Sequence, residues 1–230
     1  MTARRTGTET MEERCAPVRI HHPLNSSHCR EIMVAAIVLA AGASSRMGSR
    51  NKLLLPYHGK PLLAHVVKCT LASSVGEVVI VVGHEADLVQ DVLAGYAVTI
   101  AHNTHYHGGK TSSIRVGMAA ASAMATGYMI CLADLPLVTS AEHNRVIDAF
   151  LTAYSEDPRA IVRPVYEGQP GHPVILSATY RQELLSTDTP HACRNVVRRH
   201  HAFVREIPWN TDHVIRDVDT PEAYAALIDT

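Results

Sequence analysis

The stretch VAAIVLAAGASSRMGSRNKLLL, residues 34–55, determines how the rest of the sequence is interpreted. Its first eight residues form a continuous apolar run, which is typical of a β-strand buried on both faces of a parallel sheet. Small residues, serines and basic residues follow directly behind this run. Small residues let the backbone approach a ligand closely, and successive N–H groups in such a turn bind anions. We therefore expect a buried strand followed by a phosphate-binding loop, with a plain surface loop of solvated charges as the alternative.

Two basic side chains complete the predicted phosphate loop. Arg46 can bind phosphate oxygens through two donors, and Lys52 supplies a compact positive charge. Two other phosphate-binding motifs fail at single positions. The dinucleotide fingerprint G-x-G-x-x-G fails because residue 44 is serine, and the P-loop fails because Thr104 stands where its first glycine is required. The loop at 39–52 therefore predicts a nucleoside triphosphate site of a different kind.

Strand-like and helix-like segments alternate along the chain. After the first strand, apolar runs that predict strands lie at 77–82, 98–101, 128–132, 160–165, 173–176 and 202–207. Helical patterns lie between them, at 61–73, 85–93, 111–126, 139–154, 178–186, 190–200 and 220–228. This alternation predicts an α/β domain with right-handed crossovers, whose ligands lie at the carboxyl ends of the strands. We expect one domain at 33–230, preceded by a poorly ordered extension at 1–32.

Composition excludes several classes of protein. The formal net charge is -1, so no overall field draws the chain to nucleic acid or to an anionic membrane. None of the five cysteines forms a C-x-x-C pair, which argues against a disulfide framework or a zinc ribbon. No apolar run reaches the roughly 18 residues that a membrane helix needs. We expect a cytoplasmic enzyme with neither a membrane nor a nucleic-acid partner.

Three acidic residues are candidate metal ligands. Asp134 ends a buried strand in CLADLPLV (131–138), where a carboxylate is costly unless it is solvated or meets a cation such as Mg²⁺. Asp217 and Asp219 alternate across Val218, so they share a face of an extended segment. The alternatives are an ordinary turn residue for Asp134 and a helix start for Asp219.

Two further motifs are weaker. Ser112 and Ser113 begin a predicted helix, where they either donate to a ligand or only cap the helix. Gly171 and His172 belong to EGQPGHP (167–173), which either lines an acceptor pocket or forms a hairpin turn. The histidines at 102, 105 and 107 do not have the spacing of a standard zinc site.

The stretch LAAGASSRMGSRNKLLLPYHGKPLLAH (39–65) resembles the opening of molybdenum cofactor cytidylyltransferases, in the molybdopterin-guanylyltransferase-like nucleotidyltransferase superfamily. Further matches follow in order and extend the resemblance over 34–225: Asn103, Gly108, Ser112-Ser113-Ile114, Gly117, ADLP, GQPGHP and DVDTP. The chain departs from the family at 187–194, where many members have an acidic-Gly-Ala-Arg turn. That departure leaves the identity of the acceptor open.

The resemblance implies a three-layer, doubly wound, mostly parallel sheet of the Rossmann-like nucleotidyltransferase kind, in a single domain. It implies that Lys52, Arg46 and Asp134 are catalytic, and that Asp134 binds Mg²⁺ with help from Asp219 and Asp217. Gly171 and His172 would lie near the acceptor. The implied nucleotide-binding residues are Leu39, Ala40, Ala41, Gly42, Arg46, Lys52, Ser112 and Ser113.

The implied reaction moves CMP from CTP to the terminal phosphate of molybdopterin and releases pyrophosphate. CTP is expected because relatives that use GTP typically carry two glycines where this chain has Ala41-Gly42. A molybdenum hydroxylase or its chaperone is the expected protein partner. The alternatives are transfer from GTP or CTP to another phosphorylated acceptor, a nicotinamide-dependent oxidoreductase derived from this superfamily, and a non-catalytic nucleotide-binding accessory protein.

Overall fold

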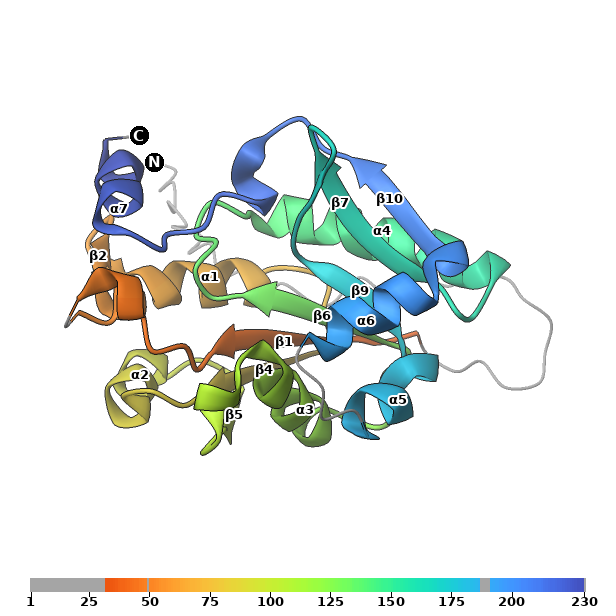
Figure 1. Ribbon diagram of the computed structural model, residues 1–230, viewed down its shortest axis with the longest axis horizontal. Helices are drawn as coiled ribbons and strands as arrows, with labels where there is room; N and C mark the ends of the chain where they lie inside the picture. The colour runs from red at the N-terminus through yellow and green to blue at the C-terminus, as the bar shows by residue number, and fades with distance from the viewer. Residues whose placement is uncertain (1–31, 49, 187–190, 230) are drawn as a thin grey trace, which may run out of the picture.

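The computed structural model describes residues 32–48, 50–186 and 191–229. Nearly all of the expected extension at 1–32, and residues 187–190, lie outside the described residues. Within the described part, an eight-stranded sheet has the order β10-β7-β9-β6-β1-β4-β5, with β8 paired to β7 (Figure 1). Its strands are β1 (Val34–Ala40), β4 (Glu77–Val82), β5 (Thr99–His102), β6 (Gly127–Leu132), β7 (Ile161–Tyr166), β8 (Gln169–Pro170), β9 (Val174–Ser177) and β10 (Val204–Pro208).

The sheet is mostly parallel, as the sequence predicts. β1 pairs in parallel with β4 on one side and with β6 on the other, so that Ile37 lies opposite both Val79 and Ile130. β4 and β5 continue the parallel order, whereas β9 runs antiparallel between β6 and β7. The carboxyl ends of β1, β4, β5 and β6 therefore meet at one edge of the sheet.

Helices cover both faces and produce three layers (Figure 1). They are α1 (Leu62–Leu71), α2 (Ala86–Leu93), α3 (Lys110–Ala120), α4 (Ser140–Glu156), α5 (Arg181–Ser186), α6 (Ala192–Arg199) and α7 (Pro221–Ile228). Alternate residues of β1 face opposite cores. Ala36 and Val38 belong to the core that contains side chains of α1 and α4, whereas Ile37 belongs to the core with α3, α5 and α6. The fold class predicted from the sequence is confirmed.

Some of the predicted element boundaries were wrong. The helix expected at 111–126 ends at Ala120, because Ala121 is extended and the next backbone N–H, that of Ser122, bonds to the side chain of Glu77 at 2.9 Å. A small hairpin of β2 (Pro56–Tyr57) and β3 (Lys60–Pro61) precedes α1, where the sequence predicts only a loop. Among the described residues, no helix is long and apolar enough to cross a membrane.

Close packing fixes the position of α3, whose first turn reaches the edge where the carboxyl ends of β1, β4, β5 and β6 meet. An added Cβ at Gly117 would lie 2.3 Å from Ile37 Cγ2 and 2.9 Å from Val81 Cγ2. Only glycine permits this approach of the helix to β1 and β4. The N-terminus of α3 is thereby held beside the loop that follows β1.

Candidate nucleotide and metal site

The loop behind β1 is built by its own polar side chains. Ser44 adopts a left-handed conformation with a φ of 50°, and its Oγ accepts a hydrogen bond from the backbone N–H of Lys52 at 3.2 Å. The side chain of Asn51 caps the short 3-10 turn Lys52–Leu54 by accepting from the N–H of Leu53 at 3.1 Å. These contacts fix the backbone at Lys52 and therefore the position of its side chain.

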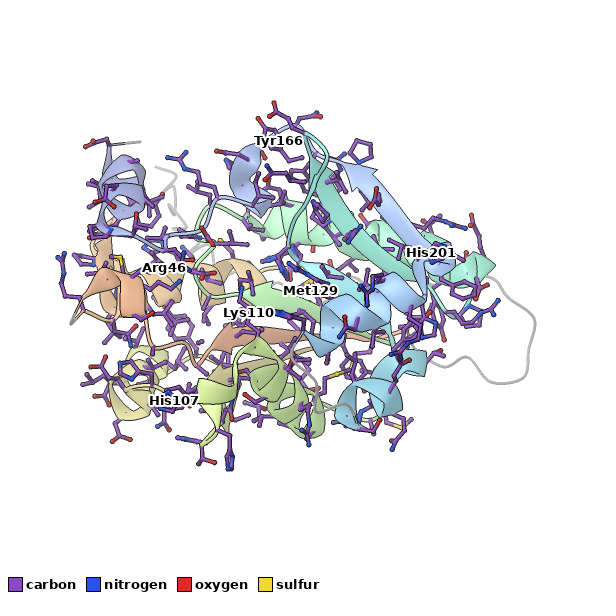
Figure 2. All side chains as sticks on the ribbon, viewed as in Figure 1. Arg46, His107, Lys110, Met129, Tyr166 and His201 are labelled. Atoms are coloured by element: carbon purple, nitrogen blue, oxygen red, sulfur yellow. The ribbon has the colours of Figure 1, made fainter. Side chains whose placement is uncertain are left out.

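A cavity of about 480 Å³ opens at the carboxyl ends of the central strands. Its lining combines the loop behind β1, the start of α3 and two of the predicted acidic residues. Figure 2 shows two of these residues, Arg46 and Lys110, on the same side of the molecule. The lining residues are Leu39, Ala41, Gly42, Ala43, Ser44, Ser45, Arg46, Lys52, Leu53, Tyr106, His107, Gly109, Lys110, Ser113, Leu132, Asp134 and Asp219.

Lys52 lies at the base of this cavity and bridges two carboxylates. Its Nζ is 2.5 Å from Asp134 Oδ2 and also donates to Asp219 Oδ1. Only 8% of Lys52 is exposed, and Arg46, which is far more exposed, pairs with the other oxygen of Asp219. Burial lowers the pKa of Lys52, but the two carboxylates more than offset this effect, so its pKa is raised. The ammonium is therefore charged at neutral pH.

The three predicted acidic residues converge although they lie far apart in the sequence. One carboxylate oxygen each of Asp134, Asp217 and Asp219 lies within 4.8 Å of the others. The backbone N–H of Val218 donates to the carbonyl of Asp134 at 2.9 Å, which anchors the second segment at the end of β6. Burial raises the pKa of Asp219, but Lys52 and Arg46 lower it overall. Burial and the charges of Asp219 and Asp134 raise the pKa of Asp217.

This cluster fits a divalent cation. Asp134 Oδ1 is buried and has no hydrogen-bond partner among the described residues, while its other oxygen faces Lys52. A buried carboxylate oxygen without a partner is costly, and metal coordination would remove that cost. Two or three carboxylates with open positions suit Mg²⁺ or Mn²⁺, which bind hard oxygen ligands and share substrate phosphates.

The two serines of α3 have different surroundings. Ser113 lines the cavity, whereas Ser112 donates to the carbonyls of His105 and Gly109 and is not among the lining residues. The buried Asn103 amide donates to both hydroxyls at 2.9 Å. Asn103 therefore positions Ser113 toward the cavity, and Ser112 holds the loop in front of α3.

Gly171 and His172 are not among the residues that line the cavity. An added Cβ at Gly171 would lie 2.6 Å from the carbonyl oxygen of Val214, so this glycine is required by packing. The His172 ring lies 3.3 Å from the carbonyl oxygen of Ile130. Burial lowers the pKa of His172 to about 4, so the ring is neutral at pH 7 and offers hydrogen bonds, not charge. Ala40 faces the core, although Leu39 and Ala41 on either side of it line the cavity.

Sequence reasoning did not assign a site role to three lining residues, Tyr106, His107 and Lys110. Gly83 has no room for a Cβ, which would lie 2.8 Å from Tyr106 Cβ and 2.9 Å from Ala41 Cβ. The segments behind β1, β4 and β5 thus pack closely to form one wall. Lys110 is the first residue of α3, within the triplet Gly109-Lys110-Thr111. A basic residue at the start of a helix that follows a strand was the sequence feature that could have indicated a site role.

A doubly wound sheet with a basic loop, an acidic cluster and a shared cavity at its carboxyl edge defines a nucleotide-binding α/β protein. Residues 36–203 match the model of the MobA-like NTP transferase domain, and the chain belongs to this family. It thus falls in the nucleotidyltransferase superfamily, as the sequence resemblance implies.

Individual relatives agree with this placement. The chain is 31% identical over 215 residues to nicotine blue oxidoreductase of Paenarthrobacter nicotinovorans, covering 85% of this chain and 96% of that protein. It is 26% identical to molybdenum cofactor cytidylyltransferase of Escherichia coli, covering 83% and 93%. A crystallised Mycobacterium tuberculosis protein in complex with manganese is 26% identical, with a TM-score of 0.72 over 86% of this chain and 99% of that chain. A similar protein thus carries a divalent metal.

Proposed function

We propose that the protein transfers a CMP unit from CTP to the terminal phosphate of molybdopterin in the molybdenum cofactor and releases pyrophosphate. One observation carries the proposal. The Lys52 ammonium lies between Asp134 and Asp219 at the base of a cavity whose wall is the loop at 39–52. This arrangement places cations for a triphosphate directly beside carboxylates for a divalent ion.

The chain's own residues supply positioning and charge neutralisation. An oxygen of the acceptor phosphate forms a bond to the α-phosphorus of CTP, the bond from that phosphorus to the bridging oxygen breaks, and pyrophosphate leaves. Backbone N–H groups of the loop and the side chains of Lys52 and Arg46 donate to the phosphate oxygens. Lys52 stabilises charge at the α-phosphate, and Arg46 holds the leaving pyrophosphate.

The acidic cluster has two roles in this proposal. Asp134, Asp219 and Asp217 would hold Mg²⁺, which when bound neutralises charge on the triphosphate. In the structure described here, the same carboxylates hold Lys52 and Arg46 in place. Binding of the ion at these carboxylates would release both cations toward the phosphates.

The choice of CTP and molybdopterin is supported by the relatives. The Escherichia coli relative is a molybdenum cofactor cytidylyltransferase. Ala41, which lines the cavity, stands where relatives that use GTP typically carry a glycine. A cytoplasmic location and delivery of the product to a molybdenum hydroxylase or its chaperone follow from the same assignment.

Pyrophosphate release tests the proposal directly. The protein is incubated with Mg²⁺, molybdopterin that carries molybdenum, and CTP, GTP or ATP in turn. We expect release with CTP, and a decrease on the order of a hundredfold in Lys52→Ala. Lys60→Ala removes the same charge from the exposed hairpin and should retain activity. Near-normal turnover of Lys52→Ala would refute its role, and release only with another phosphorylated acceptor would reassign the substrate.

A second candidate has a specific observation behind it. The 31% identity to nicotine blue oxidoreductase favours a nicotinamide-dependent oxidoreductase. Hydride transfer, however, does not call for three convergent carboxylates beside a buried lysine. Binding of NADH, followed by fluorescence without metal, combined with no pyrophosphate release from any acceptor, would favour this candidate. Binding of CTP with neither activity would indicate a non-catalytic accessory protein.

A further inference from the structure

A second hollow of about 530 Å³ lies between α6 and the outer strands β7 and β10. It shares no lining residue with the cavity at 39–52. Figure 2 shows one of its residues, His201, at the opposite end of the molecule from Arg46. The lining residues are Arg163, Arg194, Val197, Arg198, His201, Val204 and Glu206.

The hollow has an excess of two positive charges when its histidine is neutral. The carboxylate of Glu206 is neutralised by Arg163, whose Nε and Nη2 donate to it at 3.1 and 2.6 Å. Arg194 and Arg198 have no hydrogen-bond or ion-pair partner among the residues that the structure describes. The neighbouring Arg199 differs, because it pairs with Glu183.

Neither the stability of α6 nor the net charge of the chain accounts for Arg194 and Arg198 at these positions. Arg194 and Arg198 lie one turn apart on α6, where like charges repel and weaken a helix. α6 has no acidic residue to offset them, and the chain as a whole has a net charge of -1. Two guanidinium groups that lack a partner among the described residues, at the edge of a hollow, are suited to bidentate binding of phosphate oxygens.

We propose that this hollow is a second anion site that binds a small phosphate-bearing molecule, of the pyrophosphate or phosphate-ester class, through Arg194 and Arg198. Its volume is in the range of small-molecule sites. The ion pair of Arg163 and Glu206 forms the opposite wall and keeps the glutamate charge away from the ligand. The proposal does not depend on the reaction carried out at the first cavity.

Calorimetric titration with inorganic pyrophosphate, without metal, tests this site. We expect the unaltered protein to bind pyrophosphate at α6, and Lys52→Ala, which alters only the first cavity, to retain this binding. The double variant Arg194→Ala/Arg198→Ala should lose that site, with at least about tenfold weaker binding. Arg205→Ala is the matched control, since it removes an arginine from β10 that pairs with Glu156 and does not line the hollow.

Each contrary result would overturn the proposal in a different way. Absence of pyrophosphate binding, or its complete loss in Lys52→Ala, would mean that no second site exists. Equal weakening in Arg205→Ala and in the double variant would show only an effect of overall charge. Citrate binding as tightly as pyrophosphate would reject phosphate recognition. Tighter, arginine-dependent binding of a polyglutamate peptide would make the hollow a protein-docking surface.

Discussion

The fold does not require a glycine at position 42, whereas we expect ligand binding to require one. An added Cβ there would meet no atom within 4 Å, and the backbone is not in the left-handed region. The residue nevertheless lines the cavity at 39–52. A side chain at this position would therefore enter the cavity in which we propose that the nucleotide binds, without disturbing the fold.

We expect Gly42→Val to leave the free energy of unfolding within about 0.5 kcal/mol of the original. Its Kd for CTP with Mg²⁺ should rise by at least about tenfold, because the added branched group displaces the phosphates from the loop. Gly42→Ala should have a smaller effect in the same direction. Chemical unfolding and equilibrium titration measure the two quantities. Unchanged affinity in Gly42→Val would show that the ligand does not approach this part of the loop.

Individual site residues were predictable only in part. The strand-end position of Asp134 and the small residues around Arg46 are local features, and these were visible in the sequence. The contact of Lys52 with Asp219 joins residues 167 positions apart, so no spacing rule could reveal it. The different orientations of Ser112 and Ser113 were also hidden, because the buried amide of Asn103 determines them.

At the scale of elements, one carboxylate joins α4 to the segment behind β10. Glu142 completes a capping box with Thr139 at the start of α4. Its other oxygen accepts hydrogen bonds from Trp209 Nε1 and Thr211 Oγ1 and lies 3.1 Å from His213 Nδ1. Burial raises the pKa of Glu142, but these hydrogen bonds lower it overall.

A lowered pKa in the folded state determines the sign of the pH dependence. The stabilisation from Glu142 is complete above the pKa of an unfolded glutamate and is lost as the pH falls through the lower folded value. Glu142→Gln should cost about 1–2 kcal/mol at pH 7. It should also lose less stability than the unaltered protein between pH 7 and about pH 4. Urea unfolding at both pH values measures this difference.

The matched control is Glu156→Gln, at the exposed end of the same helix. Glu156 makes only a 3.8 Å ion pair with Arg205, and both side chains are more than half exposed. Its loss should change stability by less than about 0.5 kcal/mol. If Glu142→Gln retained the full pH dependence of the unaltered protein, the carboxylate would not be its source.

Element types were more predictable than their ends. Continuous apolar runs identified β1, β4 and β6, since strands buried on both faces leave no polar position. The helix predicted at 139–154 is confirmed as α4, which Thr139 caps by accepting from the backbone N–H of Glu142. The end of α3 was predicted wrongly because Glu77, on β4, accepts a hydrogen bond from the backbone N–H of Ser122, just beyond the helix. Such a long-range partner has no signature within the helix itself.

At the scale of the whole molecule, parallel topology brings the acidic and basic groups to one edge of the sheet. That edge was predictable, because the carboxyl ends of neighbouring parallel strands must meet. The convergence of Asp217 and Asp219 on Asp134 was implied by the family resemblance and not by spacing, since it depends on a long return of the chain past β10. The backbone hydrogen bond from Val218 to Asp134 fixes this return.

The charge balance of the assembled site makes nucleotide and metal binding interdependent. Three carboxylates lie within 4.8 Å of one another, and two of them already pair with Lys52 or Arg46. A triphosphate alone must displace these carboxylates from the cations and then face their negative charge. A divalent ion at the cluster removes both obstacles, so each ligand should increase the affinity for the other.

Thermal unfolding should reveal this coupling. CTP with Mg²⁺ or Mn²⁺, at about 100 times its Kd, should stabilise the fold by about 2.7 kcal/mol, which corresponds to a rise in Tm on the order of 5–10 °C for a chain of this size. The rise in Tm with CTP alone and the rise with metal alone should add up to much less than the rise with both. Asp134→Asn should abolish the excess, because it removes a charged ligand from the cluster while retaining its shape. An equal rise in Tm with CTP alone would show that the carboxylates do not take part in nucleotide binding, and the Lys52 ion pairs would then be only structural.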